Sequence, residues 1–150
     1  MKRLEDRLAI EDLNAAFAYH LDHDEVEPLT ALFTEDALYT NGPRRSEGRD
    51  AIAAFFRSRT TAGPRTARHF YSGLRIAFDG DGQARGTSVW LTFARDRLPP
   101  IDDCAPFLVA DFTDVYRRCA DGRWRIQRRH IEPIFRNPTI TPPGAAVAPR

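Results

Sequence analysis

The densest group of chemistry-bearing side chains lies around residue 20 of this 150-residue chain, in the segment His20-Leu21-Asp22-His23-Asp24-Glu25. Imidazole and carboxylate groups are metal ligands, and His20 and His23 would lie on adjacent turns of a helix. No HExxH-type context and no distant third ligand accompany them. We therefore interpret the segment as a polar helix end and expect no metal site.

Further reactive side chains interrupt segments that otherwise have the pattern of strands. Asp111 follows the apolar run of residues 107–110, where a carboxylate is costly unless it is paired or hydrated. It could be a pocket acid, a partner of Arg129 or a residue at a strand edge. In the strand expected at residues 123–135, strict alternation of side chains predicts that Arg125, Gln127 and Arg129 share one face. The opposite face would then hold Trp124, Ile126, Arg128 and His130.

Aromatic side chains are the remaining candidates for contact with a small molecule. Tyr19 and Tyr71 are candidate hydroxyl donors, as is Tyr39. Phe55 and Trp90 are expected in the core or in the wall of a pocket. The alternative for each tyrosine is a role in packing alone.

Helical patterns fill the first 60 residues. Apolar residues recur at helical spacing up to about residue 23, at Leu4, Leu8, Leu13, Phe17 and Leu21. Pro28 is expected in the first turn of a short second helix. A brief strand is expected at 37–40, and a third helix is expected to begin near Asp50.

Strand patterns follow. Residues 67–78 and 83–94 flank Asp79-Gly80-Asp81-Gly82, and residues 107–118 and 123–135 flank Ala120-Asp121-Gly122, so both pairs predict hairpins. A bulge near Ser72-Gly73 would bring His69 and Tyr71 to the same concave face as the apolar residues 74, 76 and 78. Helices followed by antiparallel strands predict an α+β fold.

The bulk composition limits the partners. Lys+Arg of 22 against Asp+Glu of 21 leaves a formal charge of +1, with the two signs interleaved, so we expect no nucleic-acid and no membrane partner. The chain has no signal-peptide pattern, and we expect a cytoplasmic protein whose Cys104 and Cys119 are free thiols.

Several short segments resemble the SnoaL-like group of the NTF2-like superfamily: Ile10-Glu11-Asp12-Leu13, Leu21-Asp22, Leu32-Phe33-Thr34-Glu35-Asp36-Ala37, Glu47-Gly48-Arg49-Asp50-Ala51-Ile52 and Asp121-Gly122-Arg123-Trp124-Arg125-Ile126. The resemblance implies an NTF2-like cone, with the N-terminal helices packed in a curved, mixed, mostly antiparallel sheet. We expect this domain to span 1–138 and an extended tail to follow at 139–150. Relatives of this shape usually form dimers or trimers, so a homo-oligomer is expected.

The resemblance also implies a set of catalytic residues. In the scytalone dehydratase, bile-acid dehydratase and lindane dehydrochlorinase branch, an aspartate late in the first helix pairs with a histidine early in the first long strand. Asp22 and His69 match these positions, and Arg129 falls where the dehydrochlorinase has an arginine. The ketosteroid isomerase base position is Asn41 here, an amide that cannot accept a proton at neutral pH.

These residues predict a cofactor-independent lyase or isomerase that acts on a small, cyclic, apolar substrate by dehydratase-like elimination, double-bond migration or cyclisation. His69 would be the base, Asp22 its orienting partner and Arg129 an electrostatic helper. The alternative is a non-catalytic NTF2-like binding or assembly module, in which Asp22 would face solvent or an interface.

Overall fold

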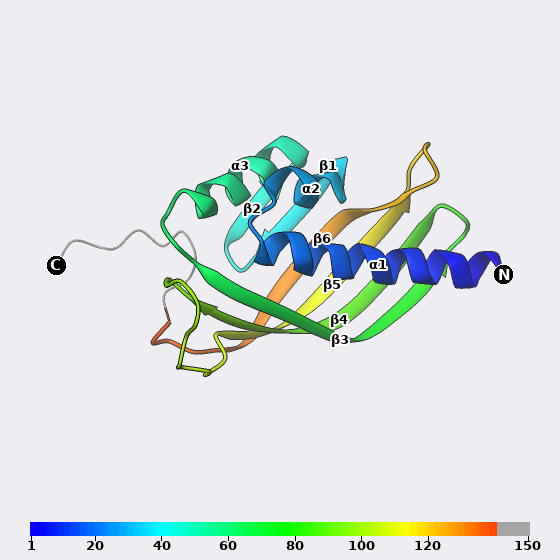
Figure 1. Ribbon diagram of the computed structural model, residues 1–150. Helices are drawn as coiled ribbons and strands as arrows, with labels where there is room; N and C mark the ends of the chain where they lie inside the picture. The colour runs from blue at the N-terminus through cyan, green and yellow to red at the C-terminus, as the bar shows by residue number, and fades with distance from the viewer. Residues whose placement is uncertain (141–150) are drawn as a thin grey trace.

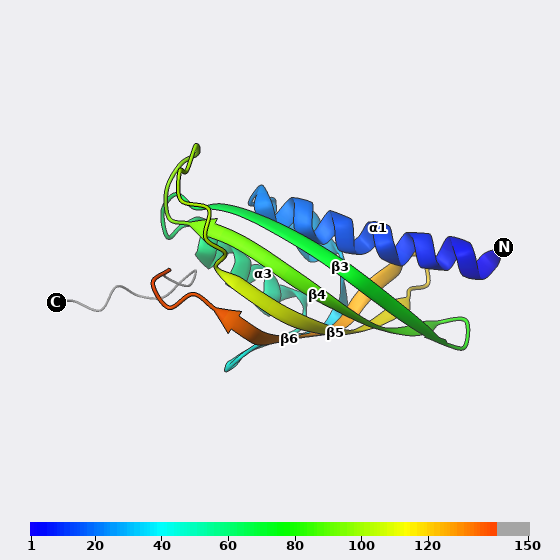
Figure 2. The same cartoon turned by 90° about the horizontal axis from the view of Figure 1, so that it is seen from below.

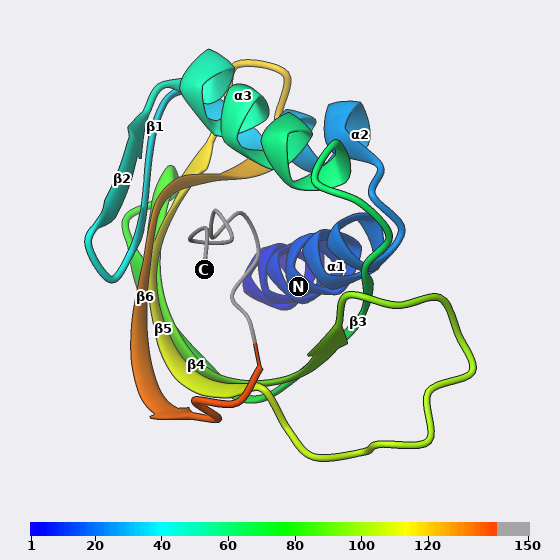
Figure 3. The same cartoon turned by 90° about the vertical axis from the view of Figure 1, so that its left-hand side faces the viewer.

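A long N-terminal helix lies inside a strongly curved sheet in the computed structural model, which describes residues 1–140 (Figure 1). Helix α1 (Lys2–Asp22) is followed by the short α2 (Val26–Ala31) and by α3 (Arg49–Thr60). Seen along α1, the sheet curls around this helix, and α2 and α3 lie across the gap between the two sheet edges (Figure 3). No helix in this part of the chain has the length and apolar character needed to cross a bilayer.

The sheet has six strands in the order β2-β1-β6-β5-β4-β3. Their bounds are β1 (Phe33–Asn41), β2 (Arg44–Glu47), β3 (Thr66–Asp79), β4 (Gln83–Arg95), β5 (Leu108–Arg118) and β6 (Trp124–Arg136). Only the β1–β6 pair is parallel. The expected α+β cone with a mixed, mostly antiparallel sheet is therefore confirmed. Figure 2 shows β3, β4 and β5 as the long strands that form its curved outer wall.

Two local predictions about the elements were incomplete. Strand β2 was not expected; it pairs with β1 through the turn at Gly42-Pro43. The apolar stripe predicted for α1 is wrong at its start, because Leu4 and Leu8 are exposed. The buried face of the helix instead includes the polar side chains Asp6 and Asn14, both of which find partners inside the cone.

A bulge in β3 confirms the parity argument made from the sequence. The β3–β4 register shifts between Ser72 and Arg75, and Gly73 has a φ of +64°, a left-handed conformation that glycine adopts at little cost. The bulge lets His69 and Tyr71 face the same side as the apolar residues that follow it. Both halves of this 14-residue strand therefore contribute to the interior.

A second bulge, in β6, overturns the predicted alternation. Val115 pairs with Arg128 and Tyr116 with Ile126, which leaves Gln127 without a partner in the register. The extra residue puts Arg129 on the inner face together with Trp124 and Ile126, although strict alternation places it on the other face. A single unpaired residue thus places this expected site residue in the interior, where it is fully buried.

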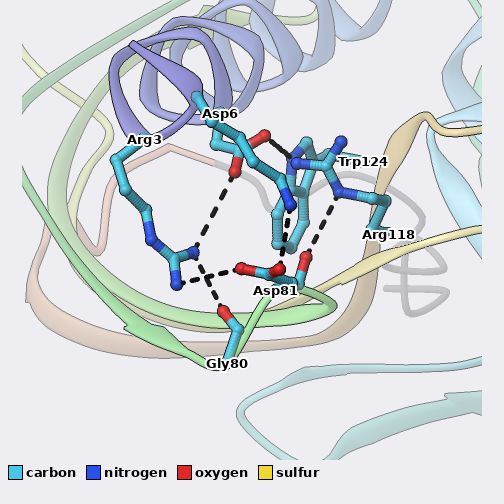
Figure 4. A network of polar contacts seen from close by, with 7 residues as sticks. Arg3, Asp6, Gly80, Asp81, Arg118 and Trp124 are labelled. Atoms are coloured by element: carbon cyan, nitrogen blue, oxygen red, sulfur yellow. Dashed lines mark hydrogen bonds and ion pairs between the residues drawn. The ribbon is translucent and has the colours of Figure 1, made fainter.

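The first turn of α1 is tied to two hairpin ends by a polar network (Figure 4). Buried Asp6 accepts hydrogen bonds from Arg118 and from Nε1 of Trp124, the latter at 3.1 Å. Arg3 donates to the carbonyl of Gly80 at 2.9 Å and pairs with Asp81. This network fastens the N-terminal end of α1 to the β3–β4 and β5–β6 turns. The C-terminal end of α1, where Asp22 lies, is at the opposite end of the cone.

Candidate active site

The last residue of α1 and an early residue of β3 form the central contact of the candidate site. Oδ1 of Asp22 lies 2.5 Å from Nδ1 of His69, and Oδ2 of Asp22 accepts the backbone N–H of His69 at 2.9 Å. The two side chains are only 7% and 11% exposed. Because a carboxylate only accepts hydrogen bonds, Nδ1 carries the proton, and Nε2 is the free acceptor of the neutral ring.

The imidazole of His69 forms part of the wall of a cavity of about 260 Å³ at the open end of the cone. Within residues 1–140, Nε2 has no hydrogen-bond partner. Most of the wall is apolar and is contributed by Phe17, Leu21, Phe55, Ala67, Ala94, Phe107, Leu108, Ala110, Phe112, Ile131 and Pro133. A proton acceptor held against such a wall is the arrangement that general-base chemistry on carbon requires.

Three uncharged polar side chains share the cavity with His69. Thr92 is the register partner of His69 across β3 and β4, and Tyr39 and Asn41 come from β1. Burial raises the pKa of Tyr39, so its hydroxyl stays protonated and can donate a hydrogen bond. Asn41, the amide at the steroid-isomerase base position, is thus also part of this wall.

Arg129 belongs to a buried polar network behind the cavity. Its Nε and Nη2 donate to the Asp114 carboxylate at 2.9 and 2.8 Å, and Nη2 also donates to Oδ1 of Asn14 at 2.5 Å. Tyr116 donates to Asp114 and accepts from Asn14. Burial lowers the pKa of Arg129, but the Asp114 carboxylate outweighs it, so the pKa lies above its ordinary value.

Aromatic rings separate this network from the cavity. The guanidinium carbon of Arg129 is 4.3 Å from the ring centroid of Phe17 and 5.1 Å from that of Phe112, and both rings line the cavity. Arg129 itself is not part of the cavity wall. It therefore meets the site through two rings rather than through a direct polar contact.

Two expected binding residues lie outside the cavity. Asp111 is exposed, because the even-numbered residues of β5 point inward, and Asp114 rather than Asp111 pairs with Arg129. Tyr19 is 56% exposed and stacks on the ring of His23 at 4.1 Å. Each side chain thus lies on the outer surface of its element and away from the cavity.

Of the other expected aromatic residues, one lines the cavity and two pack behind its wall. Phe55 lines the cavity. Tyr71 donates its hydroxyl to the carbonyl of Glu11 at 3.1 Å and stacks on Trp90 at 4.9 Å. Trp90 in turn stacks on Phe112 at 4.6 Å. Tyr71 and Trp90 therefore stiffen the wall from behind and do not form its surface.

The inward-facing Asp114 and the arginines of the cavity were not predicted from the sequence. Asp114 shares strand parity with Phe112 and Tyr116, so the period of two could have identified it. Arg59 follows Phe55 by one helical turn, which is the corresponding signal on α3. Arg44, Arg65 and Arg136 lie in or beside turns, where no periodicity marks them.

The polar segment at the end of α1 forms a second histidine–carboxylate contact. Nδ1 of His20 lies 2.6 Å from Oε2 of Glu25, outside the cavity. Residues 1–140 contain no group of three or more His, Cys, Asp or Glu side chains placed to hold one metal ion. This pair resembles Asp22–His69 in distance alone, since His20 borders only a pocket of about 10 Å³.

The fold and the site together define a class of protein: a cone-shaped α+β domain with a mostly apolar cavity at its open end. Residues 2–130 match the model of the SnoaL-like domain, and the chain belongs to that family within the NTF2-like superfamily. A comparison with curated proteins finds no significant match.

Solved structures share this architecture over nearly the whole chain. A candidate scytalone dehydratase from Novosphingobium aromaticivorans is 26% identical, with a TM-score of 0.78 and 97% of each chain covered. LinA is 22% identical, with a TM-score of 0.77, over 99% of this chain and 97% of LinA. ActVI-ORFA from Streptomyces coelicolor is 22% identical, with a TM-score of 0.72, over 85% of this chain and 96% of its own. The last two likenesses show the fold alone.

Proposed function

We propose that this protein is a cofactor-independent lyase or isomerase for a small, cyclic, largely apolar molecule. His69 is the general base, and Asp22 is the residue that orients it. The observation that carries the proposal is the 2.5 Å contact between Asp22 and Nδ1 of His69, with the imidazole on the wall of an apolar cavity. Membership of the SnoaL-like family and the likeness to a candidate scytalone dehydratase support the same reaction class.

The reaction begins with transfer of a proton from a substrate carbon to Nε2 of His69. The electron pair of the broken C–H bond forms a double bond, and the Asp22 carboxylate stabilises the imidazolium that results. In an elimination, that imidazolium gives its proton to the departing hydroxyl, which leaves as water. Return of the proton to a different carbon gives double-bond migration, and attack of the carbanion on a carbonyl group gives cyclisation.

Arg129 has an indirect role in this proposal. Its cation is balanced by Asp114 and screened by Phe17, so it favours negative charge in the cavity only at a distance. Its larger contribution is to hold the aromatic wall in position. The hydroxyls of Tyr39 and Thr92 are better placed to donate hydrogen bonds to a substrate oxygen.

The tautomer of His69 tests the pair without a substrate. We expect ¹⁵N imidazole spectra of the native protein to show neutral His69 protonated at Nδ1. In Asp22→Asn, the introduced amide has one oxygen for two N–H donors. The backbone N–H of His69 keeps that oxygen, so the ring should change to the Nε2–H tautomer. His20→Gln is the control and should leave the His69 signals unchanged. An Nε2–H ring in the native protein would contradict the proposal.

Activity gives the second test of the same proposal. Hydroxylated and halogenated cyclic compounds would be screened for elimination by native protein, His69→Gln and Asp22→Asn. We expect kcat to fall by about a hundred- to ten-thousandfold in His69→Gln and to fall in Asp22→Asn as well, because acid–base catalysis contributes that much. Glu25→Gln, which breaks the other histidine–carboxylate contact, should retain full activity. Turnover that survives His69→Gln would assign the chemistry to another group.

A further inference from the structure

Arginine supplies every charged side chain on the wall of the cavity other than the imidazole of His69. The described lining contains Arg44, Arg59, Arg65 and Arg136 and no carboxylate. In the same order, these residues are the first residue of β2, a residue in the last turn of α3, the residue before β3 and the last residue of β6. They bring a concentrated positive charge to one opening of a chain whose overall formal charge is only +1.

Arg59 is the least exposed of the cavity arginines without a hydrogen bond or ion pair in the described residues; Arg44 and Arg136 also lack one, but both are exposed. It lies in the last turn of α3 beside Phe55 and Phe56, with its guanidinium carbon 6.0 and 5.8 Å from their ring centroids. Within residues 1–140, it has no hydrogen-bond or ion-pair partner. By contrast, Arg65 pairs with Asp96 at 2.5 Å, and Arg57, two residues earlier on α3, pairs with Glu27 at 3.0 Å.

The surroundings of Arg59 make its isolation costly. Burial lowers its pKa, and the nearby cations Arg65 and Arg44 lower it further. The Tyr39 hydroxyl and the exposed Asp24 carboxylate act in the other direction, but neither forms a hydrogen bond or ion pair with the guanidinium in the described part of the chain. A half-buried cation without a partner carries an electrostatic cost that an anion in the cavity would reduce.

We propose that the substrate carries a carboxylate, which Arg59 binds at the mouth of the cavity with help from Arg44. The planar guanidinium fork matches a carboxylate with two parallel N–H···O bonds. The guanidinium of Arg44 stacks over the Phe55 ring at 4.0 Å, at the same opening. The hydrocarbon ring of the substrate would then lie against Phe17, Phe55 and Phe112, with its acidic C–H toward His69. The orientation toward His69 rests on the proposed function; the charge preference does not.

Matched ligands that differ only in charge test this inference. We would measure the binding of 2-naphthoate and of naphthalene-2-carboxamide by calorimetry at neutral pH. The acid should bind about 10- to 100-fold more tightly, the factor expected for hydrogen bonds to a charged group. Arg59→Met should reduce that preference to about threefold or less. Arg57→Met changes an arginine on the same helix that is outside the cavity, and should retain the preference.

Other variants separate this inference from the reaction proposed above. His69→Gln should retain the preference for the acid, so loss of catalysis and loss of charge selection are distinguishable. Arg59→Lys preserves the charge without the fork, and should give an intermediate preference even if the methionine variant folds poorly. Equal affinities of the native protein for acid and amide, or binding of neither, would overturn the inference. Tighter binding of 2-naphthyl phosphate than of 2-naphthoate would overturn the assignment to a carboxylate.

Discussion

The Asp114–Arg129 pair is the fully buried ion pair of the interior, and its stability consequences are specific. Both side chains are 0% exposed, and Asp114 is also the acceptor for Tyr116. Asp114→Asn would leave the Arg129 cation buried without a counter-charge, so we expect a loss of about 3–5 kcal/mol in the free energy of unfolding. Urea denaturation followed by tryptophan fluorescence measures it.

The surface pair Arg117–Asp36 gives the comparison for that experiment. Asp36 is exposed, although its hydrogen bond with Arg117 lowers its pKa to about 2. Asp36→Asn should cost at most about 1 kcal/mol, because solvent screens the pair. A similar loss in both variants would mean that burial contributes nothing to the Asp114–Arg129 interaction.

At the residue scale, sequence reasoning was accurate where a motif marked the position and failed where a backbone irregularity intervened. Asp22 and His69 were predicted from family motifs, and they are in contact. Strict alternation placed Arg129 on the face opposite Trp124 and Ile126. The unpaired Gln127 in β6 shifts the alternation and brings Arg129 to the same inner face. Nothing in the local sequence marks that bulge.

At the scale of elements, the β3 bulge makes a long strand contribute to the cone along its whole length. A Cβ added at Gly73 meets no atom within 4 Å, so substitution there reports backbone conformation alone. We expect Gly73→Ala to lower the free energy of unfolding by about 1–2 kcal/mol, since alanine is strained at a φ of +64°. Chemical denaturation measures the change.

Gly82→Ala is the matched control for that substitution. Gly82 is also free of neighbours within 4 Å, but its backbone is not in the left-handed region. This variant should be neutral or slightly stabilising, because alanine restricts the unfolded chain. A Gly73→Ala protein as stable as Gly82→Ala would show that the bulge does not need glycine.

Elements with strong local signals were predicted well. Both long hairpins and all three helices occur where periodicity and turn residues indicated. Strand β2 has only four residues and an Arg-Arg-Ser-Glu sequence without an apolar alternation, so its pairing depends on β1 rather than on its own composition. Short strands of this kind are defined by the sheet that they join.

At the scale of the whole molecule, the outer face of the sheet predicts self-association. Phe70 and Phe93 lie edge to face, with ring centroids 6.1 Å apart, and Phe70 is exposed on β3. Val89 on β4 is exposed as well. We expect a dimer or trimer that covers these side chains, because apolar surface of this kind is stabilised by burial.

Sedimentation of the native protein and of Phe70→Glu tests this expectation. The native protein should sediment as an oligomer, and the charged variant should shift toward the monomer while its circular dichroism stays unchanged. Thr87→Glu, a substitution at an exposed position elsewhere on β4, serves as the control. A native protein that remains monomeric at high micromolar concentration would contradict the expectation.

The double hydrogen bond accepted by Asp22 also covers a backbone donor at the edge of the sheet. Strand β3 is at one edge of the sheet, and the N–H of His69 is one of the donors along that edge. An unpaired edge donor is a template for another strand, and proteins usually cover such edges. We therefore expect the Asp22 carboxylate to protect this edge against pairing with another strand, and a variant whose side chain has no acceptor should be less soluble.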